Sequence, residues 1–256
     1  MKTFLSFFLL SIFFITSCSK DETITEPTRE YNERESGNFT FNNSKAIVIE
    51  NQTGPLIIEG SADTMNIGWF LDKHVFAASY KNANDIFEKI IVSQIELSDT
   101  LYISVKIPPA ANSANTSLSL TLPNSIPCII RNVDGVSIIN YIQANIECKI
   151  LSDLSITGHD GNCTIDGSGE NVNVEMALPE NGFCLINIEV GNINLRLPSS
   201  TSAMLLAQTN DGAIFSSGLS ISDSVRIPTR LSGKLGNGSG QINLSTGKGN
   251  ISIVGF

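Results

Sequence analysis

The sequence predicts an all-β protein, built as a β-solenoid-like stack of short strands with a small N-terminal sheet and one short helix. Short runs of alternating apolar and polar residues recur through the chain, and Asn, Asp and Gly separate them. No helix-period segment follows Thr116. Apolar markers recur at intervals of 18 to 21 residues, which is typical of stacked coils: Leu118, Ile138, Ile156, Val174, Ile193 and Ile214. A β-sandwich is the alternative.

Residues 45–109 are predicted to form the small N-terminal sheet part. Strands are expected at residues 46–50, 56–59 and within 65–78, where Trp69 should anchor the core. A short helix is expected at residues 82–88, with Asn82 or Asn84 as its N-cap. Residues 90–97 and 101–107 should then form a hairpin. Pro108 and Pro109 stop the ladder, and the solenoid part is expected at residues 116–256.

The N-terminal segment reads as a lipoprotein export signal. Residues 1–17 contain one Lys and a short apolar run, as a signal peptide does, and the run is too short to span a bilayer. Cys18 ends a lipobox-like sequence, which predicts lipid attachment there. The polar stretch 18–44 is interpreted as a flexible tether. Lys20, Asp21 and Glu22 resemble an export signal of Bacteroidota lipoproteins, so the protein is expected at the outer membrane, on either face.

Composition limits the classes of partner. Sixteen Lys and Arg stand against 25 Asp and Glu, a net charge of −9. A nucleic-acid binder needs basic density to displace counterions from phosphates, so that class is excluded. Hydrophobic residues make up 41% of the chain, which is too many for a disordered protein.

Repeated local patterns carry a family resemblance. Leu122-Pro123 and Leu197-Pro198 each end a strand, and Asp134-Gly135 and Asp211-Gly212 turns follow them. The chain closes on Gly-Asn-Ile-Ser-Ile at residues 249–253. These patterns resemble the bacterial putative-adhesin β-strand-repeat family, a domain of unknown function related to putative auto-transporter adhesin head domains. The resemblance implies a right-handed β-helix-like architecture in the cell envelope, with no catalytic residues and no cofactor.

The cysteines that remain after lipidation are four, an even number in an exported chain. Their spacings of 20, 15 and 21 place them at similar points of successive coils. The sequence is compatible with disulfides among them and with a buried stack of free thiols. These residues are Cys128, Cys148, Cys163 and Cys184.

Metal and catalytic sites have little support in the sequence. Only His74 and His159 are present and no Cys-x-x-Cys occurs, so no metal site is predicted. Asp160, Asp166 and Glu170 offer the oxygens that calcium prefers, but turn chemistry explains the same residues. Carboxylates that a glycan-cleaving enzyme would need are expected in Asp-Gly turns: Asp134, Asp160, Asp166 and Asp211.

The function expected from these observations is that of a lipid-anchored envelope protein, an adhesin or structural module that works by binding. Glycans or other envelope proteins are the expected partners, besides the membrane itself. Two alternatives stay open: a carbohydrate-active β-helix enzyme, a polysaccharide lyase or hydrolase, and a regulatory component of the envelope stress response.

Overall fold

The computed structural model describes residues 27–40, 44–51, 54–62, 66–109, 114–132, 134–169 and 171–256. The predicted signal peptide and Cys18 lie outside this part of the chain. Its 21 strands form two sheets, and one helix accompanies them. The all-β prediction is therefore confirmed. None of the described helices is long and apolar enough to cross a membrane.

The ten-stranded sheet is called sheet A. Its strands, in spatial order, are β1 (Arg29–Thr40), β4 (Asn66–Ala77), β7 (Ala114–Pro123), β3 (Leu56–Ser61), β9 (Ser137–Asn140), β11 (Leu154–His159), β13 (Val172–Met176), β15 (Ile193–Leu197), β21 (Ile251–Gly255) and β17 (Ile214–Ser217).

The eleven-stranded sheet is called sheet B. Its strands, in spatial order, are β18 (Ile221–Ile227), β19 (Arg230–Leu235), β16 (Ala203–Asp211), β20 (Gly240–Lys248), β14 (Phe183–Val190), β12 (Cys163–Gly167), β10 (Ile146–Ile150), β8 (Cys128–Asn132), β2 (Ala46–Asn51), β6 (Thr100–Lys106) and β5 (Ile91–Leu97).

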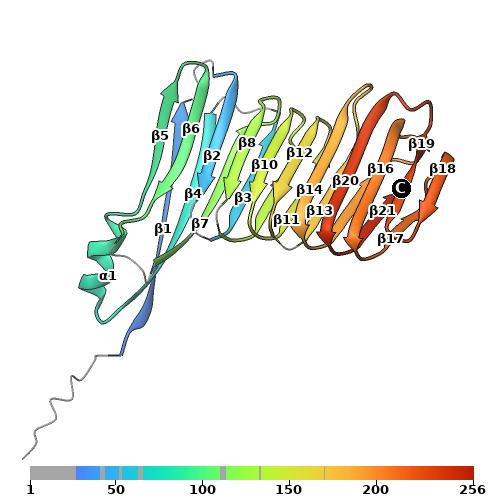
Figure 1. The fold of residues 1–256 in the computed structure, drawn as a ribbon. Helices are drawn as coiled ribbons and strands as arrows, with labels where there is room; N and C mark the ends of the chain where they lie inside the picture. The colour runs from blue at the N-terminus through green and yellow to red at the C-terminus, as the bar shows by residue number, and fades with distance from the viewer. Residues whose placement is uncertain are drawn as a thin grey trace, which may run out of the picture.

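The two sheets face one another along the whole stack, and the chain passes from one to the other at each coil (Figure 1). Strand pairs between successive coils are parallel, whereas a β-sandwich is built from antiparallel pairs. Within the described residues, antiparallel pairs occur only near the two ends of the stack. The arrangement is consistent with the predicted solenoid.

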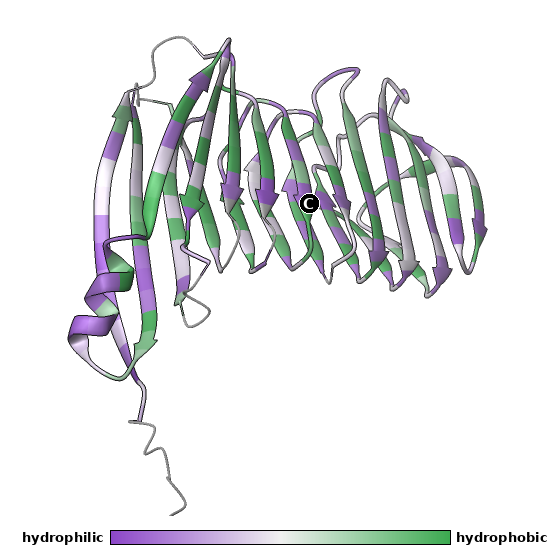
Figure 2. Ribbon diagram, turned by 60° about the vertical axis from the view of Figure 1, so that its left-hand side comes forward, coloured by the Kyte–Doolittle hydropathy of each residue, from purple (hydrophilic) through white to green (hydrophobic). Residues whose placement is uncertain are grey.

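The core is a set of apolar ladders between the sheets. Ile165 pairs with Cys148 on one side and Ile186 on the other, and all three side chains are buried. In sheet A, Val174 lies in register between Ile156 and Leu195. Hydrophobic and hydrophilic residues alternate along many of the strands in Figure 2, as expected when one face of a strand is buried and the other is exposed to water.

The spacing predicted from the marker residues holds only in the middle of the stack. Ser137, Leu154, Val172 and Ile193 lie in register in sheet A, so three successive coils there take 17, 18 and 21 residues. At the ends, spatial order departs from chain order. The coil of β2 and β3 lies between the coils of β6–β7 and β8–β9, and the coil of β20 and β21 lies between those of β14–β15 and β16–β17.

Two expectations for the N-terminal part are wrong. Residues 29–40, placed in the flexible tether, form strand β1, which pairs antiparallel with β4 along its whole length. The strands of the predicted small N-terminal sheet belong to sheets A and B themselves, because β2 pairs with both β6 and β8. The hairpin of β5 and β6 is confirmed.

The helix begins earlier than predicted. Helix α1 spans Tyr80–Phe87, and its N-cap is Ser79 rather than Asn82 or Asn84. Ser79 has extended backbone angles, and its hydroxyl accepts a hydrogen bond from the Asn82 N–H at 3.3 Å, as an N-cap requires. Trp69 is buried, as expected, and stacks on Phe39 of β1 with ring centroids 5.8 Å apart.

Candidate functional site

Residues proposed from the sequence for metal binding lie apart in the fold. Asp160 is exposed in the turn after β11, and Asp166 faces outward from β12, in register with Lys149 and Asn187. Glu170 lies outside the described residues. Across the part of the chain that the structure describes, no three His, Cys, Asp or Glu side chains are grouped as a metal ion would need. The fold therefore does not gather the described calcium candidates.

The carboxylates considered for glycan cleavage are also dispersed. Asp134 is exposed in the turn before β9, and Asp211 is exposed at the end of β16. Asp166 has Lys149 and Asn187, not a second carboxylate, as its neighbours on the strands to either side. A retaining or inverting glycosidase needs two carboxylates facing one substrate bond. The carboxylate that shares a hollow with Asp166 is Glu189 of β14, two residues beyond Asn187, and it was not among the candidates taken from the sequence.

His159 is a structural residue. Its side chain is buried, Nδ1 lies 2.6 Å from the Ile142 carbonyl oxygen, and Nε2 lies 3.2 Å from the Asn162 carbonyl oxygen. Burial lowers the pKa of this imidazole from its ordinary value. Because both ring nitrogens face backbone carbonyls, neither is directed toward a metal ion.

The four cysteines of the body lie on consecutive strands of sheet B, as the spacing predicted. Cys163 and Cys184 are in register on β12 and β14, whereas Cys148 lies two residues away from that level. All four are buried free thiols. Burial raises the pKa of the Cys128 thiol to about 12 and raises that of Cys148 still further. These thiols act as small apolar side chains in the core.

The outer face of sheet B carries the candidate site. Three hollows, with volumes of about 590, 370 and 450 Å³, lie side by side on this face. The first two share Leu206 and Asn243, and the last two share Asp166 and Asn187. The hollows thus form one continuous surface, the outer groove, which crosses the strands from β19 to β8. Adjacent strands are about 4.8 Å apart, so the groove is roughly 29 Å long.

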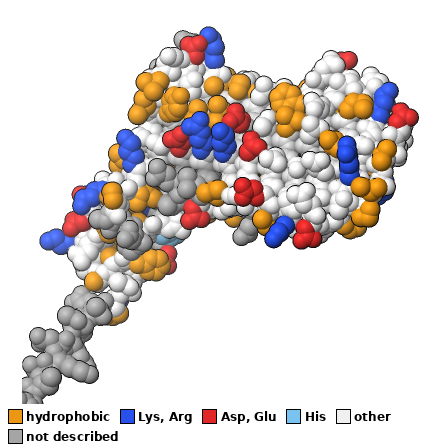
Figure 3. Space-filling model, in the orientation of Figure 1, with side chains coloured by type: hydrophobic (Ala, Val, Ile, Leu, Met, Phe, Trp, Pro, Cys, Tyr) orange, Lys and Arg blue, Asp and Glu red, His pale blue; other side chains and the backbone are white. Residues whose placement is uncertain are grey.

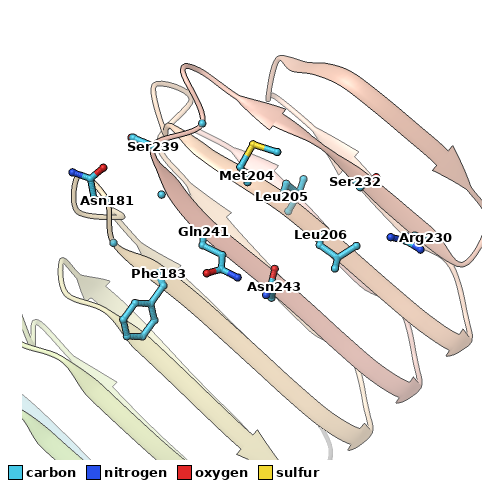
Figure 4. A pocket seen from close by; sticks show the side chains of 13 residues that line it. Asn181, Phe183, Met204, Leu205, Leu206, Arg230, Ser232, Ser239, Gln241 and Asn243 are labelled. Carbon is cyan, nitrogen blue, oxygen red and sulfur yellow. The ribbon is translucent and has the colours of Figure 1, made fainter.

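Strand register explains which side chains line the groove. Phe183, Gln241 and Met204 form one outward row across β14, β20 and β16. Two residues further along each strand, Leu185, Asn243 and Leu206 form the next row. Figure 4 shows Phe183, Gln241, Met204 and Leu206 projecting from these three adjacent strands.

A third row adds charge to the groove. It runs from Asn187 through Ser245 and Gln208 to Arg230 on β19. Arg230 is exposed and lines the largest hollow. At the opposite end of the groove, Lys149 and Arg131 lie side by side on β10 and β8. Basic side chains flanked by acidic ones are visible over the middle of the molecule in Figure 3.

The rim of the largest hollow is a glycine-rich loop. Residues 236–239 form the turn before β20, which begins at Gly240. The Ser202 hydroxyl accepts hydrogen bonds from the N–H groups of Asn237 and Gly238, at 2.9 and 3.1 Å. Gly240 approaches the opposite turn so closely that a Cβ there would lie 2.9 Å from the Gly182 carbonyl oxygen. The rim is therefore held by the Ser202 side chain and by close packing of the backbone at Gly240.

The amides of the groove differ from those on the other sheet. On sheet A, Asn194 donates to Asn173 at 2.9 Å, Asn140 donates to Glu59 at 2.6 Å, and Arg196 pairs with Glu175. Within the described chain, the side chains of Gln241, Asn243 and Arg230 make no comparable hydrogen bond or ion pair. Sequence reasoning missed these groove residues, because no motif distinguishes them from other outward-facing strand residues.

Comparison with known proteins supports the fold. A solved structure described as a putative cell adhesion protein from Clostridium sporogenes matches with a TM-score of 0.50 and 14% identity, covering 88% of this chain and all of that one. Two others, described as putative adhesins from Bacteroides fragilis and Parabacteroides merdae, match with TM-scores of 0.39 and 0.30, each at 10% identity. They cover 88% and 86% of this chain, and 97% and 96% of their own. No family model and no curated protein matches.

Proposed function

We propose that this protein is a non-catalytic adhesion module of the bacterial cell surface, which binds its ligand along the outer groove of sheet B. The observation that carries the proposal is the groove itself, in which side-chain amides and an arginine are left without partners over adjacent strands. A buried catalytic cleft would be enclosed, whereas this surface is long and shallow. A structural neighbour described as a putative cell adhesion protein supports the same role.

The proposed anchor is a lipid on Cys18. Processing there would leave a tether that joins the membrane to β1, the outermost strand of sheet A at one end of the stack. The largest hollow lies near the other end, over β14, β20, β16 and β19. Such an arrangement would present the groove away from the membrane. Cys18→Ala should abolish lipid labelling and retention in the outer membrane, and lipid labelling that persists would contradict this assignment.

The coils are proposed to wind as a right-handed β-helix. Parallel strands joined through a crossover are almost always connected with right-handed geometry. The resemblance to the adhesin repeat family implies the same hand. A rigid solenoid of this kind offers a flat face in which ligand-contacting rows are fixed by strand register.

Adhesion and catalysis are distinguished by one experiment. Beads coated with the chain from Ser19 onward are passed over surfaces coated with mucin, acidic polysaccharide or neutral polysaccharide, and retained beads are counted under flow. The same protein is incubated with each polymer and assayed for new reducing ends and for unsaturated products. Retention without cleavage is expected. Cleavage would instead support the carbohydrate-active enzyme. If the beads adhere to none of the surfaces, the adhesion role is contradicted.

A further inference from the structure

We infer that the ligand of the outer groove is a linear oligosaccharide that carries carboxylates, held by Arg230 and by the ring of Phe183. This inference rests on the proposed adhesion function and adds the ligand class and the residues that select it. Three features of the groove lead to it: the shape, the mixture of apolar and amide groups, and the distribution of charge.

Shape favours an extended ligand. The three hollows share residues and follow one another across the strands, along the axis of the stack. A compact small molecule is usually enclosed on most of its surface, which an open face of this kind cannot do. A linear polymer instead makes many modest contacts along a groove. The roughly 29 Å length given by the strand spacing suits several sugar units in a row.

The chemistry of the lining suits sugar rings. Phe183 is half-buried, so its ring is fixed while one part stays accessible, and Met204 and Leu206 extend the apolar surface beside it. Gln241 and Asn243 lie between these apolar side chains on the central strand. A sugar ring has apolar C–H faces and hydroxyl edges, and the hydroxyls can pair with amide donors and acceptors. Alternating apolar and amide side chains therefore match a saccharide better than an apolar peptide.

Charge selects an acidic saccharide. The largest hollow is lined by Arg230 and by no carboxylate, although the whole chain has a net charge of −9. Arg34, Arg131 and Arg196 each pair with a carboxylate in the described structure, whereas Arg230, like Arg29 and Arg226, does not. Arginine binds carboxylates through a planar pair of N–H donors. Arg230 is thus available to a ligand carboxylate.

The far end of the groove is balanced in charge, because Asp166 and Glu189 line the same hollow as Lys149 and Arg131. Lys149 makes no ion pair among the described residues, and it faces Asp166 in register on the next strand. Arg131 beside it is already paired with Glu50 at 2.8 Å. We therefore assign the anion contact to Arg230 alone.

The test is a titration of the chain from Ser19 onward with defined oligosaccharides. Hexagalacturonate, a hyaluronan hexasaccharide and sialyllactose supply carboxylates from three kinds of source, and maltohexaose is the neutral probe of matched length. Arg230→Gln is compared with Arg226→Gln, a nearby exposed arginine on β18 that does not line the groove. Phe183→Ala is compared with Phe215→Ala, an exposed ring on sheet A. Circular dichroism checks that all four variants fold.

We expect at least one acidic oligosaccharide to bind, and maltohexaose to bind at least tenfold more weakly. Arg230→Gln should weaken the acidic ligand by roughly tenfold to a hundredfold, which is the range for a lost charge-assisted hydrogen bond. Phe183→Ala should weaken it as well, while Arg226→Gln and Phe215→Ala should leave it within twofold. The acidic probe that binds identifies the source of the ligand.

Three outcomes would overturn the inference. They are no binding of any acidic probe, equal binding of maltohexaose, and undiminished binding by folded Arg230→Gln and Phe183→Ala proteins. If beads coated with the wild-type chain still adhere to a surface in those cases, the adhesion function stands and only this ligand assignment fails. If the wild-type beads adhere to nothing, the proposed function itself fails.

Discussion

A buried lysine links the N-terminal strand to the body of the protein, and its removal should be less harmful than removal of its partners. Lys73 of β4 has only 4% of its side chain exposed, and its Nζ lies 3.0 Å from Glu33 and 2.9 Å from Glu35 of β1. It also donates to the Phe87 carbonyl oxygen at 3.0 Å. The two carboxylates are 39% and 47% exposed. The ammonium group is therefore the desolvated member of this cluster.

The asymmetry of burial sets the expected magnitudes. In the Glu33→Gln/Glu35→Gln variant the buried ammonium loses both counter-charges, and leaving a buried charge uncompensated costs about 3–5 kcal/mol. In Lys73→Met the two carboxylates regain water, and the main loss is the hydrogen bond to Phe87, about 1 kcal/mol. The double glutamine variant should therefore be less stable than Lys73→Met by about 2–4 kcal/mol. The triple variant should resemble Lys73→Met.

Trp69 provides the assay. It is the only tryptophan of the chain, and it stacks on Phe39 of β1, so its fluorescence reports whether β1 stays docked. Urea unfolding of the four proteins, followed by tryptophan fluorescence, gives their free energies of unfolding. If Lys73→Met is destabilised as much as the double glutamine variant, or more, the argument that the buried cation depends on these carboxylates is wrong.

Three further predictions concern the body of the stack. A Cβ on Gly249 would lie 2.0 Å from the Gly191 carbonyl oxygen, so Gly249→Ala should lower the free energy of unfolding by at least about 2 kcal/mol. The control is Gly68→Ala, where the nearest atom to the new Cβ would be 3.5 Å away, and it should change this free energy by less than about 1 kcal/mol. Burial lowers the pKa of His159, so below the ordinary value of about 6.5 the unfolded chain binds more protons than the folded one. Urea midpoints should therefore fall from pH 7 to pH 5 in the wild type, and less steeply in His159→Gln. The four core thiols should resist a thiol reagent in the native protein and all react in guanidinium, and a count below four would show that a disulfide forms.

Local patterns in the sequence predicted the strands of sheet A in the middle of the stack. The marker residues Ile156, Val174 and Ile193 each lie between two polar residues, and this period of two is enough to identify buried strand faces. The placement of the four cysteines on consecutive strands followed from their spacing, because a coil in the middle of the stack has a nearly constant length. These features depend on neighbours within one coil or on the coil length alone.

Strand β1 escaped prediction because its stabilising contacts come from elsewhere in the chain. Its sequence is rich in Glu and Arg, which is typical of a solvated linker. It pairs with β4, roughly 40 residues later in the chain. There Lys73 forms ion pairs with Glu33 and Glu35, and Arg34 pairs with Asp72 at 2.6 Å. The charges of β1 are paired with charges on β4, and the sequence around β1 alone cannot predict that pairing.

The candidate site could not be predicted from the sequence, because it too depends on contacts between distant parts of the chain. The same contacts determine where the groove lies. Gln241 lies next to Phe183 and Met204 only because the last coil, β20 and β21, occupies the position between the coils of β14–β15 and β16–β17. Regular coil spacing alone would have placed Met204 beside Phe183 and left β20 at the end of the stack. Strand β20 places Gln241 and Asn243 between the apolar side chains of β14 and those of β16. The groove therefore has alternating apolar and amide side chains. The same topology that hides the site from the sequence therefore creates its chemistry.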